Sequence, residues 1–257
     1  MKKLANVAET LLPFLAIAAL WEGLARSGYF TPLLLPPLAA ILSEFWALVK
    51  SGVLLHHLAA STARLMVGFA LGLVVGTTIG IAMGLSGRVE RFFLPILNIC
   101  LPIPSIALVP LFALWFGLGN LAVIMLVIFV CSLQVIFNTW TGVKTADERL
   151  IRVGQSMAAP RAMTIREIVL PAALPMILTG ARLALARGWI GTVAGELVAA
   201  TDWGLGWMIF NALQFLKTAT MLVGLITIGL VGYLIERVVF QPLETRTVVR
   251  WGMVKER

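Results

Sequence analysis

Long uncharged runs of apolar residues dominate the pattern along this chain. Residues 65–87, 92–143 and 218–235 contain no charged side chain. A helix needs roughly 20 apolar residues to cross about 30 Å of hydrocarbon, and the turn at Phe116–Asn120 divides the longest run into two helices. The pattern therefore predicts six transmembrane helices, at about 8–26, 65–86, 92–115, 121–142, 173–200 and 217–239.

Composition indicates the environment of these helices. The 257 residues are 60% hydrophobic and only 12% charged, with a mean hydropathy of +0.98, whereas typical soluble domains have about 25% charged residues. The predicted fold class is all-α: a polytopic membrane helical bundle that forms a single domain over residues 1–257. The net charge is +8, but the basic residues are spread around the ends of the spans rather than gathered in one patch, so we expect no nucleic acid partner.

The segment 144–175 is a charged island between apolar spans, with five basic and three acidic residues. A break at Ala158–Pro160 separates two amphipathic stretches, and Leu170–Pro171 follows the second. This spacing predicts two short helices set across one face of the membrane. Apolar residues such as Val153 and Met157 are costly in an aqueous segment unless another surface covers them, so the segment is expected to be a docking surface.

The positive-inside rule orients the chain. If the N-terminus is cytosolic, most of the 20 Lys and Arg residues lie on the inner side, including those of 144–175. Both termini are therefore predicted to be cytosolic. Segment 28–63 is then outside, where three prolines precede an amphipathic stretch at Leu38–Val49 that is expected to lie along the outer surface.

Five glycines recur every fourth residue in the second span: Gly68, Gly72, Gly76, Gly80 and Gly84. They form one ridge on the helix, along which a neighbouring backbone can approach closely. The ridge predicts tight packing inside a bundle. A sliding contact that is used in conformational change is the alternative.

The third span contains four prolines: Pro95, Pro102, Pro104 and Pro110. Each proline removes a backbone donor and bends or breaks a helix, and irregular backbone at membrane depth is tolerated only inside protein or beside a water-filled cavity. Pro102, Pro104 and Ser105 are therefore expected in the bundle interior, beside a translocation path. A kink that is shielded from lipid and lines no path is the alternative.

The fifth span carries Arg182, Arg187 and Glu196. A charge at the bilayer centre costs roughly 2.5–3.5 kcal/mol on insertion scales, so such side chains face the interior or an interface. Arg187 facing the path would suit an anionic solute, whereas Arg182 could snorkel to the membrane surface. Glu196 precedes the turn Gly204–Gly206, and a structural hydrogen bond to a neighbouring helix is one role that its position allows.

Metal and nucleotide chemistry are not expected in this chain. His56 and His57 point about 100° apart on a helix and have no third ligand, while Cys100 and Cys131 show no metal-binding spacing. The sequence lacks G-x-x-x-x-G-K-[ST] and any Gly-Lys pair, so no phosphate-binding loop is present. Any ATP hydrolysis belongs to another subunit.

Several segments resemble the binding-protein-dependent ABC importer permeases. Leu170–Pro175 and Thr179–Arg182 are similar to the end of their EAA loop. The motifs typical of the sulfonate, taurine and nitrate permease branch are LPP at 35–37, HLAASTAR at 57–64, PIPSIALVPLFALWFGLG at 102–119 and GELVAATDWGLGWMI at 195–209.

The resemblance implies a type I ABC importer permease fold in the bacterial inner membrane and ATP-driven import of a small solute, such as a sulfonate, taurine or nitrate. It implies three kinds of partner besides membrane lipid: a second copy of this chain, two copies of an ABC ATPase subunit that hold ATP and Mg²⁺, and an extracytoplasmic solute-binding protein. The resemblance also implies that Glu196 contacts the delivered solute or the outer gate. An ion-gradient-driven secondary transporter is the alternative, but the spans show no matching halves. A redox subunit is a weaker rival, because both histidines lie outside the predicted spans.

The family's EAA pattern maps only in part onto the 144–171 coupling segment. Anchored on its last residues, the Glu-Ala-Ala positions become Arg152, Val153 and Gly154, and the Gly position becomes Ala158. Ala158 is a mild change if the turn needs no positive φ, and Glu148 could supply the missing carboxylate one turn upstream. The residues expected to couple to the ATPase are Glu148, Arg152, Val153, Gly154, Met157, Ala158, Ala159, Arg161, Ile168, Leu170 and Pro171.

Overall fold

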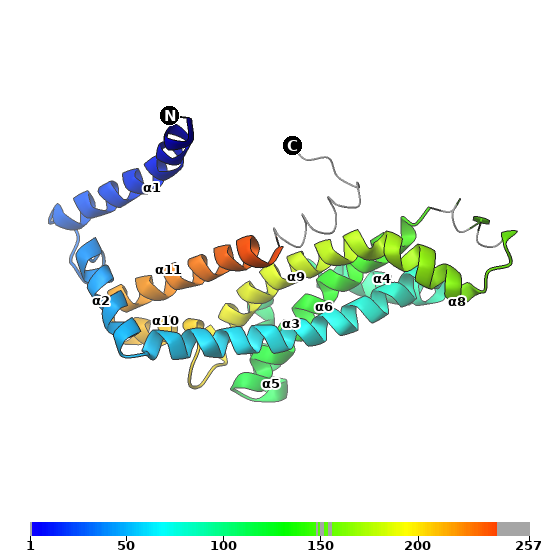
Figure 1. Cartoon of the computed structure of the whole chain (residues 1–257). Coiled ribbons are helices and arrows are strands. Elements are labelled where there is room, and N and C mark those ends of the chain that lie inside the picture. The colour runs from blue at the N-terminus through cyan, green and yellow to red at the C-terminus, as the bar shows by residue number, and fades with distance from the viewer. Residues whose placement is uncertain (1, 148, 150–151, 154–155, 241–257) are drawn as a thin grey trace.

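The computed structural model of the chain describes residues 2–147, 149, 152–153 and 156–240, with side chains from Leu12 to Val238 within them. The regular elements in this part are all helical (Figure 1). They are α1 (Lys2–Arg26), α2 (Leu38–Lys50), α3 (Val53–Leu85), α4 (Gly87–Cys100), α5 (Ser105–Phe116), α6 (Asn120–Lys144), α8 (Arg161–Thr164), the π-helix η1 (Ile165–Val169), α9 (Leu170–Val198), α10 (Leu205–Gln214), α11 (Thr218–Leu234) and the π-helix η2 (Ile235–Phe240).

Helix α6 lies at the centre of the bundle, packed between α3 and α9. The glycine ridge of α3 faces it: a Cβ added at any of the five glycines would lie between 2.3 and 2.8 Å from an α6 side chain. The facing residues are Val127, Cys131, Val135, Thr139 and Val143. Gly180 and Gly188 of α9 approach α6 as closely, at Asn138 and Cys131, respectively. Only glycine allows such a short distance between the two helices, so the ridge is a tight packing surface. The sliding contact stays a prediction.

The third predicted span is broken into two helices. Helices α4 and α5 are bent by 107° at the break, which contains Pro102 and ends at Pro104, the residue before α5. Neither proline can donate the backbone hydrogen bond that would continue a helix. Pro95 and Pro110, in contrast, lie inside α4 and α5, so the break occurs where two prolines stand close together.

Four of the six predicted spans correspond to helices in the described part that are long and apolar enough to cross a membrane. The bent pair α4–α5 passes the same test when its two halves are taken together, either as a broken span or as a re-entrant loop. The remaining prediction, 8–26, lies within α1, whose side chains are described only from Leu12 onward. That span stays a prediction.

On the predicted outer side, one helix agrees with the sequence-based expectation and one begins earlier than expected. The amphipathic helix expected at Leu38–Val49 is confirmed as α2. Helix α3, however, begins at Val53 rather than near 65, so the last third of segment 28–63 is continuous with the second span. Arg64 lies one residue before the predicted span at 65–86 and was placed on the outer side, but it is buried in the bundle and does not interrupt the helix.

The second short helix expected in 144–171 is not separate from the fifth span. Residues Arg161–Val198 form one helical rod of 38 residues, made of α8, η1 and α9. Pro171 lacks the N–H that a regular α-helical turn requires, and the wider turns of η1 directly precede it. The expected helix end at Leu170–Pro171 is therefore wrong, and the segment is joined directly to the membrane helix.

Candidate functional site

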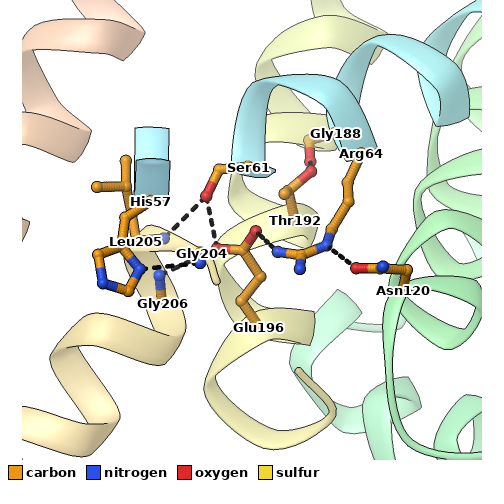
Figure 2. A network of polar contacts seen from close by, with 10 residues as sticks. All are labelled: His57, Ser61, Arg64, Asn120, Gly188, Thr192, Glu196, Gly204, Leu205 and Gly206. Carbon is orange, nitrogen blue, oxygen red and sulfur yellow. Dashed lines mark hydrogen bonds and ion pairs between the residues drawn. The ribbon is translucent and has the colours of Figure 1, made fainter. Parts of the chain in front are cut away.

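A buried ion pair joins three helices at the end of the bundle opposite segment 144–171 (Figure 2). Arg64 of α3 places Nη1 2.6 Å from Oε1 of Glu196 on α9, and its Nε donates to Asn120 Oδ1 of α6 at 2.7 Å. Arg64 is 6% exposed and Glu196 is fully buried. Each charge thus has an opposite or polar partner, which is the condition for keeping charges out of water.

The same network fixes the start of α10. The backbone N–H groups of Gly204, Leu205 and Gly206 donate to His57 Nδ1 at 3.0 Å, Ser61 Oγ at 2.8 Å and Glu196 Oε2 at 3.0 Å, respectively. The first N–H groups of a helix have no partner within it, and a carboxylate near them is stabilised by the helix dipole. Side chains of α3 and α9 therefore cap α10.

The glycines of this turn are needed for the close approach. A Cβ at Gly204 would lie 2.5 Å from Glu196 Cδ, and one at Gly206 would lie 2.5 Å from the Val193 carbonyl oxygen. Gly204 also has a φ of 152°, which side-chain-bearing residues rarely adopt. The Gly-Leu-Gly sequence is thus explained by the carboxylate that it surrounds.

Glu196 therefore has a structural role in this arrangement. Ser61 Oγ also donates to its Oε2 at 2.8 Å, so the carboxylate has partners for both oxygens and does not line the cleft described next. The structural alternative given for Glu196 matches this geometry. Sequence reasoning missed Arg64, although His57, Ser61 and Arg64 recur at helical spacing along one face of α3.

A cleft of about 500 Å³ lies where α4 and α5 break apart. It brings together Pro102, Pro104 and Ser105 with Arg187 of α9, and its walls are otherwise apolar. Arg187 is exposed, and Nη1 makes only a long, 3.4 Å hydrogen bond to the Leu101 carbonyl oxygen. Among the described residues, no carboxylate pairs with Arg187, so its positive charge is available to an anion.

The residues of the break were expected in the bundle interior, but in the single chain they do not lie there. Pro102 and Pro104 are exposed, because the 107° bend carries the break out to the side of the bundle. Ser105 and Ile106 begin α5 and line the cleft, so the positive end of a helix dipole faces the same space as Arg187.

The coupling segment is described in part. Glu148 and Gly154 lie outside the described residues. Of the others, Val153 is 55% and Met157 78% exposed, which leaves apolar surface on this segment. Arg152, Ala158, Arg161 and Pro171 are exposed as well, whereas Ala159, Ile168 and Leu170 are half-buried.

Ala158 has a φ of +54°. This left-handed conformation costs a non-glycine residue roughly 1–2 kcal/mol, so the turn does need a positive φ. Alanine at the family's glycine position is therefore a strained replacement, not a mild one.

The third charge of the fifth span has a partner. Arg182 forms a half-exposed ion pair with Glu236 of η2, which ties α9 to the end of α11. This pair is compatible with the interfacial position expected for Arg182.

Comparison with known proteins identifies the family. Residues 68–241 match the model of the binding-protein-dependent transport system inner membrane component. The chain belongs to this family. It is therefore the permease subunit of an ABC importer, a multi-pass inner-membrane protein that is not itself an enzyme, and this confirms the resemblance and sets aside the ion-gradient alternative.

Relatives that are named as transport permeases align with most of this chain. The taurine transport system permease protein TauC of Escherichia coli (strain K12) is 36% identical, over 86% of this chain and 82% of its own. The putative aliphatic sulfonates transport permease protein SsuC of Bacillus subtilis (strain 168) is 36% identical, over 94% of this chain and 86% of its own.

Solved structures show the same fold. A chain of the MetNI methionine ABC transporter in an inward-facing conformation matches with a TM-score of 0.63 at 21% identity, covering 72% of this chain and 92% of its own. The predicted all-helical importer permease fold is thus confirmed.

Proposed function

We propose that this permease imports a small organic anion of the sulfonate class. The observation that carries the proposal is Arg187, an exposed guanidinium in an otherwise apolar cleft of about 500 Å³. Guanidinium groups bind tetrahedral oxyanions through paired N–H donors, and the volume lies within the ~300–1,000 Å³ range of ligand pockets. An apolar wall with one cation suits a sulfonate that carries a short carbon chain. The named substrates of the TauC and SsuC relatives support the same class.

The cleft opens on the side of the bundle, and a second copy of this chain is proposed to close it. Importers of this family have two permease halves, and this chain supplies one of them, so two copies would form a homodimer in which the two clefts face a shared path. Pro102, Pro104, Ser105 and Arg187 would line that path, and Glu196 would stabilise its outer end without touching the solute.

The ATPase is proposed to bind segment 144–171, one copy to each permease, with ATP and Mg²⁺ held in the ATPase and none in this chain. Exposed Val153 and Met157, together with Met163 at 55% exposure, supply the apolar contacts. Because Arg161–Val198 is one continuous helix, movement of the coupling segment would move Arg187 as well. Both chain ends and this segment would lie in the cytosol, and the extracytoplasmic binding protein would deliver solute at the opposite end.

Reconstitution tests the proposed substrate class. The permease is placed in liposomes with its ATPase and binding protein, ATP is enclosed, and uptake of labelled taurine, ethanesulfonate, its uncharged isostere ethanesulfonamide, and nitrate is measured. Uptake of the two sulfonates that requires both ATP and the binding protein is expected, with no uptake of the sulfonamide. Equal uptake of the sulfonamide, or uptake of nitrate alone, would contradict the proposed class.

A further inference from the structure

Trp203 stands out on the surface at the end of the bundle opposite segment 144–171. It lies in the loop 199–204 between α9 and α10 and is 45% exposed. Its ring packs on two histidines of α3, with centroids 4.9 Å from His57 and 5.4 Å from His56. The indole is thus in contact with α3 and still partly exposed.

A hollow of about 360 Å³ lies beside this tryptophan. Charged groups of both signs surround it: Glu44 of α2, Asp202 of the loop and Lys217 at the start of α11. Glu44 is held by Thr220, whose hydroxyl donates to Oε1 at 2.7 Å. Charges of both signs around a hollow are unsuited to contact with lipid tails, whereas an aromatic anchor with a charged rim is typical of a protein–protein contact.

The loop that carries Trp203 is held at both ends. Gly119 N–H donates to the Ala199 carbonyl oxygen at 2.6 Å, and the buried network fixes Gly204, Leu205 and Gly206. A surface held in one conformation loses little entropy when a partner binds. The loop is therefore prepared for contact with a rigid partner.

We propose that Trp203 and the adjacent hollow form the docking contact for the extracytoplasmic binding protein, and that the Arg64–Glu196 network transmits docking to α9. This proposal rests on the proposed outward orientation of this end of the chain. Glu196 is on the same helical rod, Arg161–Val198, as Arg187 and residues 161–171 of the coupling segment. A displacement of the loop by the docked protein would therefore act on one helix, which reaches both the cleft and the segment proposed to bind the ATPase.

The test measures ATPase activity of the complete reconstituted complex while the solute-loaded binding protein is titrated. For Trp203→Ala we expect unchanged basal activity and at least a 10-fold higher concentration of binding protein for half-maximal stimulation. Trp46→Ala is the matched control, since Trp46 is 53% exposed on α2 but does not line the hollow. An unchanged titration of Trp203→Ala would overturn the docking contact, as would equal shifts in both variants.

A second variant tests the buried network separately from the docking surface. Ser61→Ala removes the acceptor for Leu205 N–H while leaving the Arg64–Glu196 pair in place. At saturating binding protein, where affinity no longer limits the response, maximal stimulation of the Ser61→Ala complex should fall at least 3-fold; wild-type maximal stimulation would refute transmission through the network. Stimulation and uptake are separate readouts, so a wild-type complex that is stimulated by the binding protein but transports no sulfonate would refute the proposed substrate and leave the docking contact standing.

Discussion

Two arginines of the membrane helices have opposite surroundings. Arg64 of α3 is 6% exposed and contacts a carboxylate at 2.6 Å. Arg187 of α9 is exposed, lines a cleft, and reaches only a carbonyl oxygen at 3.4 Å. Both are single positive charges between apolar residues in the sequence. Their roles differ because one charge is already neutralised and the other is not.

The difference separates stability from transport. A solute anion could bind Arg64 only by displacing Glu196. The displaced carboxylate would then be a buried charge without its partner, which costs several kcal/mol. An anion could bind Arg187 by replacing one long hydrogen bond. The first arginine therefore belongs to the framework of the fold, and the second is the candidate contact for solute.

The largest expected effect comes from breaking the buried pair. Glu196→Gln would leave the Arg64 charge buried without a carboxylate, and loss of one partner of such a pair costs about 3–5 kcal/mol. We expect the free energy of unfolding of the detergent-purified complex to fall by this amount. Thermal denaturation followed by size-exclusion chromatography would measure the change.

Two further variants sharpen this result. Adding Arg64→Met to Glu196→Gln removes the unpaired charge, so the double variant should recover part of the lost stability. Glu167→Gln is the exposed control: this carboxylate is 63% exposed and 3.9 Å from Arg166, and exposed pairs contribute little. A Glu196→Gln protein as stable as the Glu167→Gln protein would show that the pair does not support the fold.

The next effect compares the tight side of the bundle with the cleft side. At Gly76 of α3, a Cβ would lie 2.6 Å from Val135 Cβ and 2.9 Å from the Ser132 carbonyl oxygen. Gly76→Ala should therefore destabilise by about 1–3 kcal/mol through overpacking, as measured by the same denaturation.

Gly191 of α9 is the matched position beside the cleft. There a Cβ would meet Ser105 Cβ only at 3.9 Å, so Gly191→Ala should leave stability unchanged or slightly raise it, since alanine favours helix. Equal losses at Gly76 and Gly191 would mean that the two sides of the bundle are packed alike.

A smaller stability change is expected in segment 144–171. Ala158→Gly should stabilise the protein by about 1 kcal/mol, because glycine adopts the φ of +54° without the steric cost that alanine bears. Ala159→Gly, one residue later, serves as the control and should bring no gain. A lower melting temperature for Ala158→Gly than for the wild type would contradict the strained turn.

The apolar pattern predicted the helices well because segment length and hydropathy alone determine which segments can cross a membrane. The glycine ridge of α3 was also readable, since its period places all five residues on one face. The pattern could not show that Arg64 lies inside the bundle, because its partner Glu196 is 132 residues away in the sequence. It could not place the cleft either, since the direction of the α4–α5 bend depends on packing rather than on the prolines themselves.

The coupling segment shows the same limit. A proline after leucine predicted a helix end at Leu170–Pro171, but the π-helical turns of η1 allow the rod to continue. Ala158 lacked any sequence signal for positive φ except the family's glycine at that position. Local rules thus identified the elements, and contacts between distant residues decided their boundaries and roles.

The most direct test of the central claim is ATP-driven sulfonate uptake by reconstituted Arg187→Gln, with unfolding measured on the same preparation. The account predicts at least a 10-fold loss of uptake, partial recovery in Arg187→Lys, and a free energy of unfolding within about 0.5 kcal/mol of the wild type, as for an exposed residue. Normal uptake by Arg187→Gln, or loss of uptake only through unfolding, would contradict it.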